Sequence, residues 1–195
     1  MGDACPTTTT TDVTCRRAVP ADAAAVQRLV KSAYRGESSR AGWTTEADLV
    51  ADDRIDVAGV LAKMRGPGFV LVAHTHASDS DGDETAPVLV GCCEVQVQAP
   101  DGHVGYFGLF AVDPRRQGGG LGRTMLARAE HMAREELGVR TMEMSVIWTR
   151  GELIAWYVRR GYVETGRTAP FPYRQLINGK ALRDDLYFVV LEKTL

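Results

Sequence analysis

A glycine-rich turn is the segment of this chain best suited to chemistry. The apolar run Val104–Val112 predicts a buried strand, Asp113 and Pro114 turn the chain, and Gln117–Gly122 opens a predicted helix over Gly120–Leu137. Glycines let backbone N–H groups converge on one point, at which the positive end of the helix dipole is also directed. Such a turn binds anions, typically phosphate. Three arginines add positive charge around it: Arg115, Arg116 and Arg123.

Two common phosphate-binding motifs do not fit this turn. A nucleotide P-loop requires G-x-x-x-x-G-K-[ST], but Gln117 stands at the first glycine and Arg123 at the lysine. The dinucleotide motif G-x-G-x-x-G ends on Arg123 or Met125, depending on the starting glycine. A tight turn without a ligand is the structural alternative.

The spacing matches a different pattern, [RQ]-x-x-G-x-[GA], at Gln117, Gly120 and Gly122. A second motif, Y-x-x-x-G-[FY], lies in ELIAWYVRRGY, at Tyr157, Gly161 and Tyr162. On these motifs the chain resembles the GNAT superfamily of acyl-CoA-dependent N-acetyltransferases, over about residues 14–191. The segment AYRGESSRAGWTTEADL resembles a sparsely characterised branch of that superfamily.

The resemblance implies that the turn binds the pyrophosphate of acetyl-CoA through backbone amides, without a metal. The strand before the turn, around Leu109–Val112, would pair with the amide-containing arm of the cosubstrate, and a backbone N–H there would polarise the thioester carbonyl. The implied cofactor-binding residues are Phe110, Ala111, Val112, Gln117, Gly118, Gly119, Gly120, Leu121, Gly122 and Arg123.

The same resemblance implies direct transfer of the acetyl group to an amine, without a covalent enzyme intermediate. Tyr157 would act as the general acid that protonates the departing thiolate. Its structural alternative is an aromatic residue that packs under the sheet, a role equally open to Trp156 and Tyr162.

The candidate base is Glu94, in the predicted strand Val88–Val97. Strand alternation places it on one face with Val90 and Cys92, and a carboxylate on an apolar face is costly unless it is paired or functional. A salt bridge near a sheet edge is the alternative. Tyr106 and His103 are further candidates for the base.

By resemblance, the segments Tyr34–Trp43 and Pro170–Asp184 shape the acceptor pocket. Their aromatic and acidic side chains, together with Tyr106, suit a small cationic amine, although ordinary packing would explain each one singly. The candidate substrate-binding residues are Tyr34, Glu37, Trp43, Tyr106, Phe171 and Tyr173. Two positions depart from the family pattern: Leu153 replaces a frequent alanine, and Arg150 replaces an asparagine that contacts the pantetheine arm.

Composition excludes several classes of protein. The 195 residues carry 23 Lys and Arg against 25 Asp and Glu, which argues against a general nucleic-acid or anionic-membrane binder. No apolar run reaches the roughly 18–20 residues of a membrane span, and no segment resembles a signal peptide. We therefore expect a cytoplasmic protein with reduced cysteines, and the spacing of His and Cys predicts no metal site.

The order of the predicted elements indicates a mixed α/β fold. We expect a flexible tail over residues 1–13 and one domain over 14–195, with a solvated acidic loop at His76–Pro87. Asp22 and Thr45 are predicted to cap helices. The family fold implies a central, mostly antiparallel sheet of about six or seven strands flanked by helices, splayed at a β-α-β acetyl-CoA site.

The preferred function is transfer of acetyl from acetyl-CoA to the primary amine of a small molecule. A protein or peptide acceptor, and a non-catalytic acyl-CoA-binding regulatory module, are the alternatives. A long open groove would favour a peptide, and a closed pocket a small molecule. The sequence is compatible with both a monomer and a homodimer.

Overall fold

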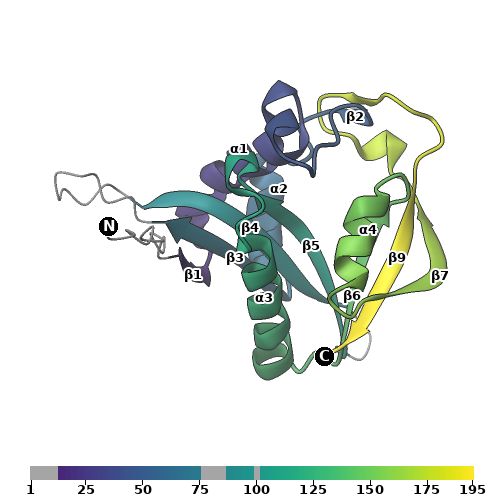
Figure 1. The fold of residues 1–195 in the computed structure, drawn as a ribbon. Helices are drawn as coiled ribbons and strands as arrows, with labels where there is room; N and C mark the ends of the chain where they lie inside the picture. The colour runs from purple at the N-terminus through teal and green to yellow at the C-terminus, as the bar shows by residue number, and fades with distance from the viewer. Residues whose placement is uncertain (1–12, 76–86, 99–101) are drawn as a thin grey trace, which may run out of the picture.

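A computed structural model describes residues 13–75, 87–98 and 102–195, which form a seven-stranded sheet in the order β1-β3-β4-β5-β6-β9-β7 (Figure 1). Only β5 and β6 run parallel. The predicted mixed, mostly antiparallel sheet is confirmed. Its strands are β1 (Val13–Arg17), β3 (Gly68–Thr75), β4 (Val88–Gln98), β5 (Val104–Val112), β6 (Thr141–Ile147), β7 (Val163–Pro170) and β9 (Tyr187–Thr194). A separate pair joins β2 (Val50–Ala51) to β8 (Lys180–Ala181).

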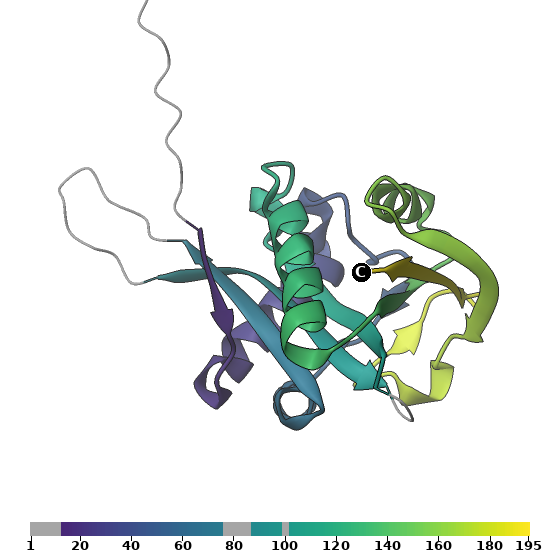
Figure 2. The same ribbon diagram turned by 90° about the horizontal axis from the view of Figure 1, so that it is seen from below.

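Helices cover both faces of the sheet (Figures 1 and 2). On one face, α1 (Ala23–Tyr34) and α2 (Val57–Arg65) pack against one buried cluster. On the other, α3 (Leu121–Leu137) and α4 (Gly151–Val158) pack against a second. None of the described helices is both long and apolar enough to cross a membrane.

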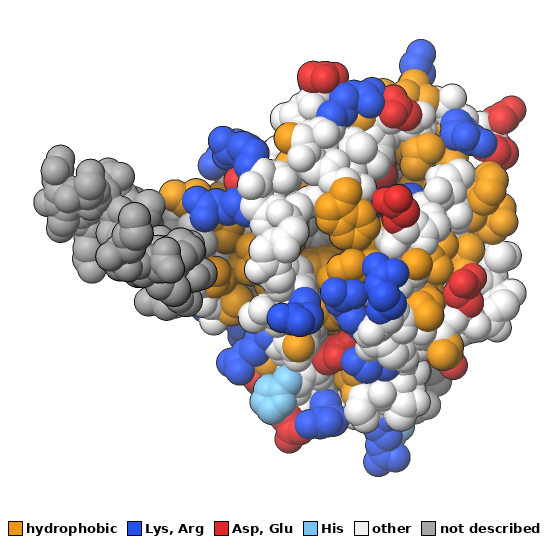
Figure 3. Space-filling model, viewed as in Figure 1, with side chains coloured by type: hydrophobic (Ala, Val, Ile, Leu, Met, Phe, Trp, Pro, Cys, Tyr) orange, Lys and Arg blue, Asp and Glu red, His pale blue; other side chains and the backbone are white. Residues whose placement is uncertain are grey.

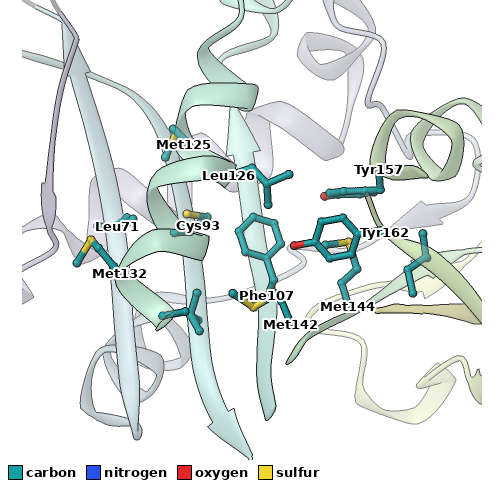
Figure 4. Close-up of a cluster of buried hydrophobic side chains, with 14 of the residues drawn as sticks. Leu71, Cys93, Phe107, Met125, Leu126, Met132, Met142, Met144, Tyr157 and Tyr162 are labelled. Atoms are coloured by element: carbon teal, nitrogen blue, oxygen red, sulfur yellow. The ribbon is translucent and has the colours of Figure 1, made fainter. Parts of the chain in front are cut away.

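The apolar stripe of α3 is buried against the sheet, as its periodicity predicts. Met125, Leu126 and Met132 are at most 5% exposed and lie over strand residues that include Leu71 and Cys93 (Figure 4). Gly138, in the left-handed region at φ +69°, ends the helix. Packing against β3, β4 and β5 therefore fixes the direction in which the N-terminus of α3 points.

The parallel strands β5 and β6 separate soon after they meet. They pair only from Val104 to Tyr106, opposite Thr141 to Glu143, and then diverge. Leu109 has a φ of +46°, and the register of β5 against β4 shifts beside it, between Cys92 and Glu94. A bulge bends a strand and increases its twist, which turns the second half of β5 away from β6. The predicted splay is present.

The two predicted helix caps fare differently. Asp22 is the N-cap residue of α1, but its carboxylate makes no capping bond to the helix; it accepts from Val19 N at 2.8 Å and pairs with Arg16, which closes the turn before α1. Thr45 begins no helix, because the chain turns back into β2 four residues after Glu46. Except for Val13, which begins β1, and Pro87, the predicted tail and acidic loop lie outside the described residues.

A matched pair of glycine substitutions tests the strand packing. A Cβ on Gly68 would lie 2.0 Å from the carbonyl oxygen of Val95, whereas one on Gly151 meets nothing within 4 Å. We expect Gly68→Ala to destabilise the protein by about 2 kcal/mol or more, because backbone must move. Gly151→Ala, at the start of α4, should be neutral or slightly stabilising. Urea unfolding measures both, and equal effects would contradict this packing.

Candidate functional site

Two cavities meet where β5 and β6 part. The first, here called the groove, has a volume of about 300 Å³ and lies between the N-terminus of α3 and α4. The second, here called the chamber, has a volume of about 320 Å³ and lies between β5, β6 and the segments 46–55 and 171–176. Both are lined by Tyr34, Phe110, Leu153 and Tyr157. These four residues form the wall between the cavities.

The glycine turn opens α3 in a form that can hold an anion. Gly118 and Gly120 have φ values of +89° and +86°, and Gly120 caps the helix without any side-chain hydrogen bond. The first helical bond runs from Thr124 N to Gly120 O, so the N–H groups of the three residues between them have no intrahelical acceptor. A Cβ on Gly118 would meet nothing within 4 Å. The site therefore has both donors and space for phosphate.

Basic side chains surround this groove. Arg116, Arg123 and Arg160 line it, and Figure 3 shows Lys and Arg side chains gathered where α3 faces α4. The Arg160 guanidinium lies 3.5 Å from the centre of the Trp156 ring. Burial, together with Arg159 and Arg123, lowers the pKa of Arg160 below its usual value. A bound anion would offset this accumulation of positive charge.

The motif residue Gln117 holds the turn in place. Its amide donates to Thr44 Oγ1 at 2.8 Å and to the Val112 carbonyl at 3.2 Å, and its oxygen accepts from Trp43 N at 3.0 Å. Eight of the ten predicted cofactor-binding residues line the groove; Ala111, buried beneath α1, and Gly119 do not. Sequence reasoning missed Trp156 and Arg160, because neither belongs to a motif.

Tyr157 reaches the junction of the two cavities from α4 (Figure 4). It is 5% exposed, and its hydroxyl makes no hydrogen bond to any described residue. Burial raises the pKa of Tyr157 well above its usual value, so the hydroxyl remains protonated. Tyr162 differs, because it is fully buried and donates its hydroxyl to Glu130 at 3.0 Å. The two motif tyrosines therefore have separate roles.

Glu94 lines the chamber and is 2% exposed. Its Oε1 accepts from Lys63 Nζ at 2.5 Å, while its buried Oε2 has no hydrogen-bond partner among the described residues. The prediction that Glu94 shares one face of the strand with Val90 and Cys92 is partly wrong. Cys92 packs against the cluster under α1, whereas Val90 belongs to the cluster under α3 on the other face. A register shift in β4 opposite Ala73 and His74 breaks the alternation there.

The other predicted site residues divide between the chamber and its surroundings. Tyr34, Tyr106 and Phe171 line the chamber, and the Tyr34 hydroxyl donates to the carbonyl of Phe110. Trp43 lies on the side of the groove. Three predicted residues line neither cavity: Glu37, Tyr173 and His103. The Glu37 side chain is 91% exposed beside Arg40, and the Tyr173 hydroxyl accepts from Leu186 N. His103 precedes β5.

The chamber also contains a buried carboxylate, Glu46, that the sequence did not indicate as a site residue. Its Oε1 lies 2.5 Å from Arg150, and its Oε2 lies 2.6 Å from Arg35 and 2.8 Å from Arg54. Burial opposes ionisation, but the three arginines outweigh it and lower the pKa of Glu46 to about 2. No local signal reveals this cluster, because its members are spread over more than a hundred residues. Arg150, at the family's asparagine position, points into it.

The thiols of the three described cysteines, Cys15, Cys92 and Cys93, line neither cavity. Cys92 and Cys93 are fully buried on opposite faces of the sheet, and burial raises the pKa of Cys92 to about 12 and that of Cys93 as well. They are therefore poor nucleophiles. Among the residues that the structure describes, no group of three or more His, Cys, Asp or Glu side chains could hold a metal ion.

Comparison with known proteins identifies the family. The family model described as "Acetyltransferase (GNAT) family" matches residues 29–162, which include the turn, the splayed strands and the Tyr157 helix. The chain belongs to the GNAT family of acetyltransferases. No curated protein sequence matches it significantly.

Solved structures share the GNAT fold. The chain is similar to yncA from Salmonella typhimurium, which was solved with its cofactor acetyl-CoA: 22% identity, 95% of each chain covered, TM-score 0.62. It is also similar to a ribosomal-protein-alanine N-acetyltransferase from Brucella melitensis, at 22% identity, with 93% of this chain and 99% of that chain covered and a TM-score of 0.63. A spermidine N-acetyltransferase chimera from Vibrio cholerae and hSSAT matches at 16% identity, 93% and 95% coverage and a TM-score of 0.60.

Loss of the Glu46 charge should be costly at neutral pH. Glu46→Gln leaves three arginines around an uncharged group, so we expect a loss of about 3 kcal/mol or more in the free energy of unfolding. The folded-state pKa lies below the unfolded one, so the stabilisation is present above pH 4.5 and disappears toward pH 2. The difference in the free energy of unfolding between wild type and Glu46→Gln should therefore decrease below pH 4.5, by up to about 1.4 kcal/mol per pH unit.

Urea unfolding from pH 7 to pH 3 measures this gap. Glu37→Gln is the matched control, because Glu37 is exposed, and its unfolding free energy should change by less than about 0.5 kcal/mol. A gap between wild type and Glu46→Gln that is constant with pH would show that Glu46 does not carry the charge described here.

Proposed function

We propose that this acetyltransferase moves the acetyl group of acetyl-CoA to the primary amine of a small molecule, in a single catalytic domain and by direct attack. The observation that carries the proposal is the meeting of two cavities at Tyr157, one suited to phosphate and the other lined by charged side chains. Groups from two substrates can meet only across that shared wall.

The strap of chain that follows β7 and covers one side of the chamber supports a small acceptor over a peptide. The chain after β7 passes over the wide end of the splay and pairs with β2 (Figure 1). Asp53 N donates to the carbonyl of Ile177 at 2.8 Å, and Leu182 N to that of Leu49 at 2.9 Å. An apolar cluster anchors this strap, formed by Val50, Ile147, Phe171 and Leu186. An extended peptide would need an open groove at this place.

The groove residues fit acetyl-CoA as the acetyl donor, which supplies an activated thioester. The open N–H groups at the start of α3 and the three arginines would hold its phosphates. Beyond Tyr106, the edge of β5 that faces β6 has no strand partner. Because the carbonyls of Phe110 and Val112 already accept from Tyr34 and Gln117, the N–H groups of this edge would serve the amide-containing arm. This arrangement positions the donor before any side chain takes part in the reaction.

Two chamber groups can then move protons. The buried Glu94 Oε2 can accept a proton from the incoming ammonium, directly or through water, and Lys63 holds the same carboxylate in place. The Tyr157 hydroxyl, which stays protonated, can donate to the departing thiolate. The buried thiols of Cys92 and Cys93 are not required.

Gly122→Leu should weaken coenzyme A binding. A Cβ at this position would lie 3.4 Å from Phe110 and 3.7 Å from Trp156, so the rest of the leucine side chain would occupy the groove. We expect Kd for coenzyme A to rise about tenfold or more by calorimetry. Gly122→Ala is the matched control, because the pattern [RQ]-x-x-G-x-[GA] accepts alanine at this position and its Cβ makes only ordinary contacts, so Kd should change little. Unchanged Kd in a folded Gly122→Leu variant would refute the assignment.

Tyr157→Phe separates proton donation from packing. Release of free thiol from acetyl-CoA with a panel of small amines measures turnover. General acid assistance is worth about 100- to 10,000-fold, so kcat should fall by that order while Kd for acetyl-CoA and Tm barely change. Tyr162→Phe, which loses the bond to Glu130, should lower stability and spare kcat. Near-normal turnover of Tyr157→Phe, with chemistry rate-limiting, would leave Tyr157 a packing residue.

A further inference from the structure

The chamber contains more positive than negative charge. Four cationic side chains line it, against three carboxylates: Arg35, Arg54, Lys63 and Arg150, against Glu46, Asp52 and Glu94. Uncompensated charge that is partly withdrawn from water costs free energy unless a partner of opposite sign is present. The position of the excess charge therefore indicates what the chamber is built to receive.

Ion pairs locate this excess. Lys63 is matched by Glu94 at 2.5 Å, and Arg35 is matched by Asp52 at 2.5 Å. The remaining carboxylate, Glu46, is shared by Arg54 and Arg150 and also accepts from Arg35. One negative charge thus serves two arginines, and the surplus positive charge lies at the Arg54–Arg150 pair.

Arg54 and Arg150 are both held in position, and both retain N–H groups that make no hydrogen bond to a carboxylate. Their guanidinium carbons lie 4.1 Å and 5.5 Å from the centre of the Tyr34 ring, for Arg54 and Arg150 respectively. Arg54 also has a φ of +58°, an uncommon conformation for a non-glycine residue that clusters at functional sites. Its bond to Glu46 uses one Nη1 hydrogen, although a guanidinium carries five.

The opposite charge preference is found elsewhere in the same chamber. Glu94 lines the chamber, and its Oε2 has no hydrogen-bond partner among the described residues, so a turn of this carboxylate toward the chamber would let it receive an ammonium group. Glu94, Tyr106 and Arg54 all line this cavity of about 320 Å³, so both sites lie in one small space. The chamber thus offers a site for a cation and a site for an anion.

We propose, on the basis of the function proposed above, that the acceptor is an amino acid or a close analogue. Its carboxylate would lie against Arg54 and Arg150, and its amine would face Glu94 and Tyr157. Bidentate bonds between guanidinium and carboxylate are strong and directional. A purely cationic polyamine would instead bring further positive charge to a chamber that already has an excess. This replaces the cationic amine expected from the aromatic residues alone.

The test compares amino acids with their own amides, which keep the amine and lose the negative charge. Full-length protein and acetyl-CoA are incubated with each free D- and L-amino acid, its amide, and spermidine, and thiol release is measured. At least one free amino acid should exceed its amide about tenfold or more in kcat/KM. Equal or greater turnover of the amides or of spermidine would overturn the inference and leave the proposed function standing.

Variants of Arg54 test the anion site itself. Arg54→Gln should raise KM for the preferred amino acid about tenfold or more, with little change for its amide and in Kd for coenzyme A, because Glu46 keeps two arginine partners. Arg54→Lys should recover part of the loss. Arg167→Gln is the control, since Arg167 is 56% exposed on β7 and lines neither cavity. Equal losses for acid and amide in Arg54→Gln would indicate a structural role and overturn the inference.

A binding readout keeps the inference separate from catalysis. The same probes are added to the protein saturated with coenzyme A, and Tm is recorded. Free amino acids should raise Tm and their amides should not. A charge-dependent shift without turnover would support the inference while the proposed function fails. If no free amino acid gives either a shift or turnover, the inference is wrong.

Discussion

The parting of β5 from β6 after three residue pairs is the constraint on which the site depends. Two parallel strands that stayed together would bury their edges against each other and leave no space for a substrate. The bulge at Leu109 turns β5 aside, and α3 and α4 then stand apart on either side of the opening. The groove, the chamber and their common wall all follow from that divergence.

Charge holds the wide end of the opening in shape. Glu46 links the nearby Arg35 and Arg54 to Arg150, which lies 104 residues further along the chain. Arg150 also donates to the Thr44 carbonyl at 2.8 Å. Thr44 in turn accepts from Gln117, so the chamber and the phosphate turn are joined by consecutive hydrogen bonds. A single buried carboxylate therefore supports both binding regions, and its loss would disturb each of them.

Local patterns predicted most of the fold but only part of the site. The periodicity of α3 and the bounds of β5 and β6 are visible in the sequence because each depends on neighbouring residues. The groove was predicted for the same reason, since its turn is continuous. The chamber is assembled from residues 34–55, 63, 94–110, 144–157 and 171–188, and no local signal pairs Glu46 with Arg150. The face of Val90 was missed because a bulge changes strand alternation without a sequence mark.

The groove and the chamber are lined by largely different residues, and this affects how such an enzyme can change during evolution. The groove is built on the turn at residues 117–123, and the chamber draws its distinctive wall from residues 46–55 and 171–176. Those sets have no member in common, and only four side chains belong to both cavities. Apart from Glu46, which supports both cavities, substitutions on one side can therefore accumulate while the other stays intact. A lineage built on this plan can exchange one acceptor for another and keep its acetyl donor.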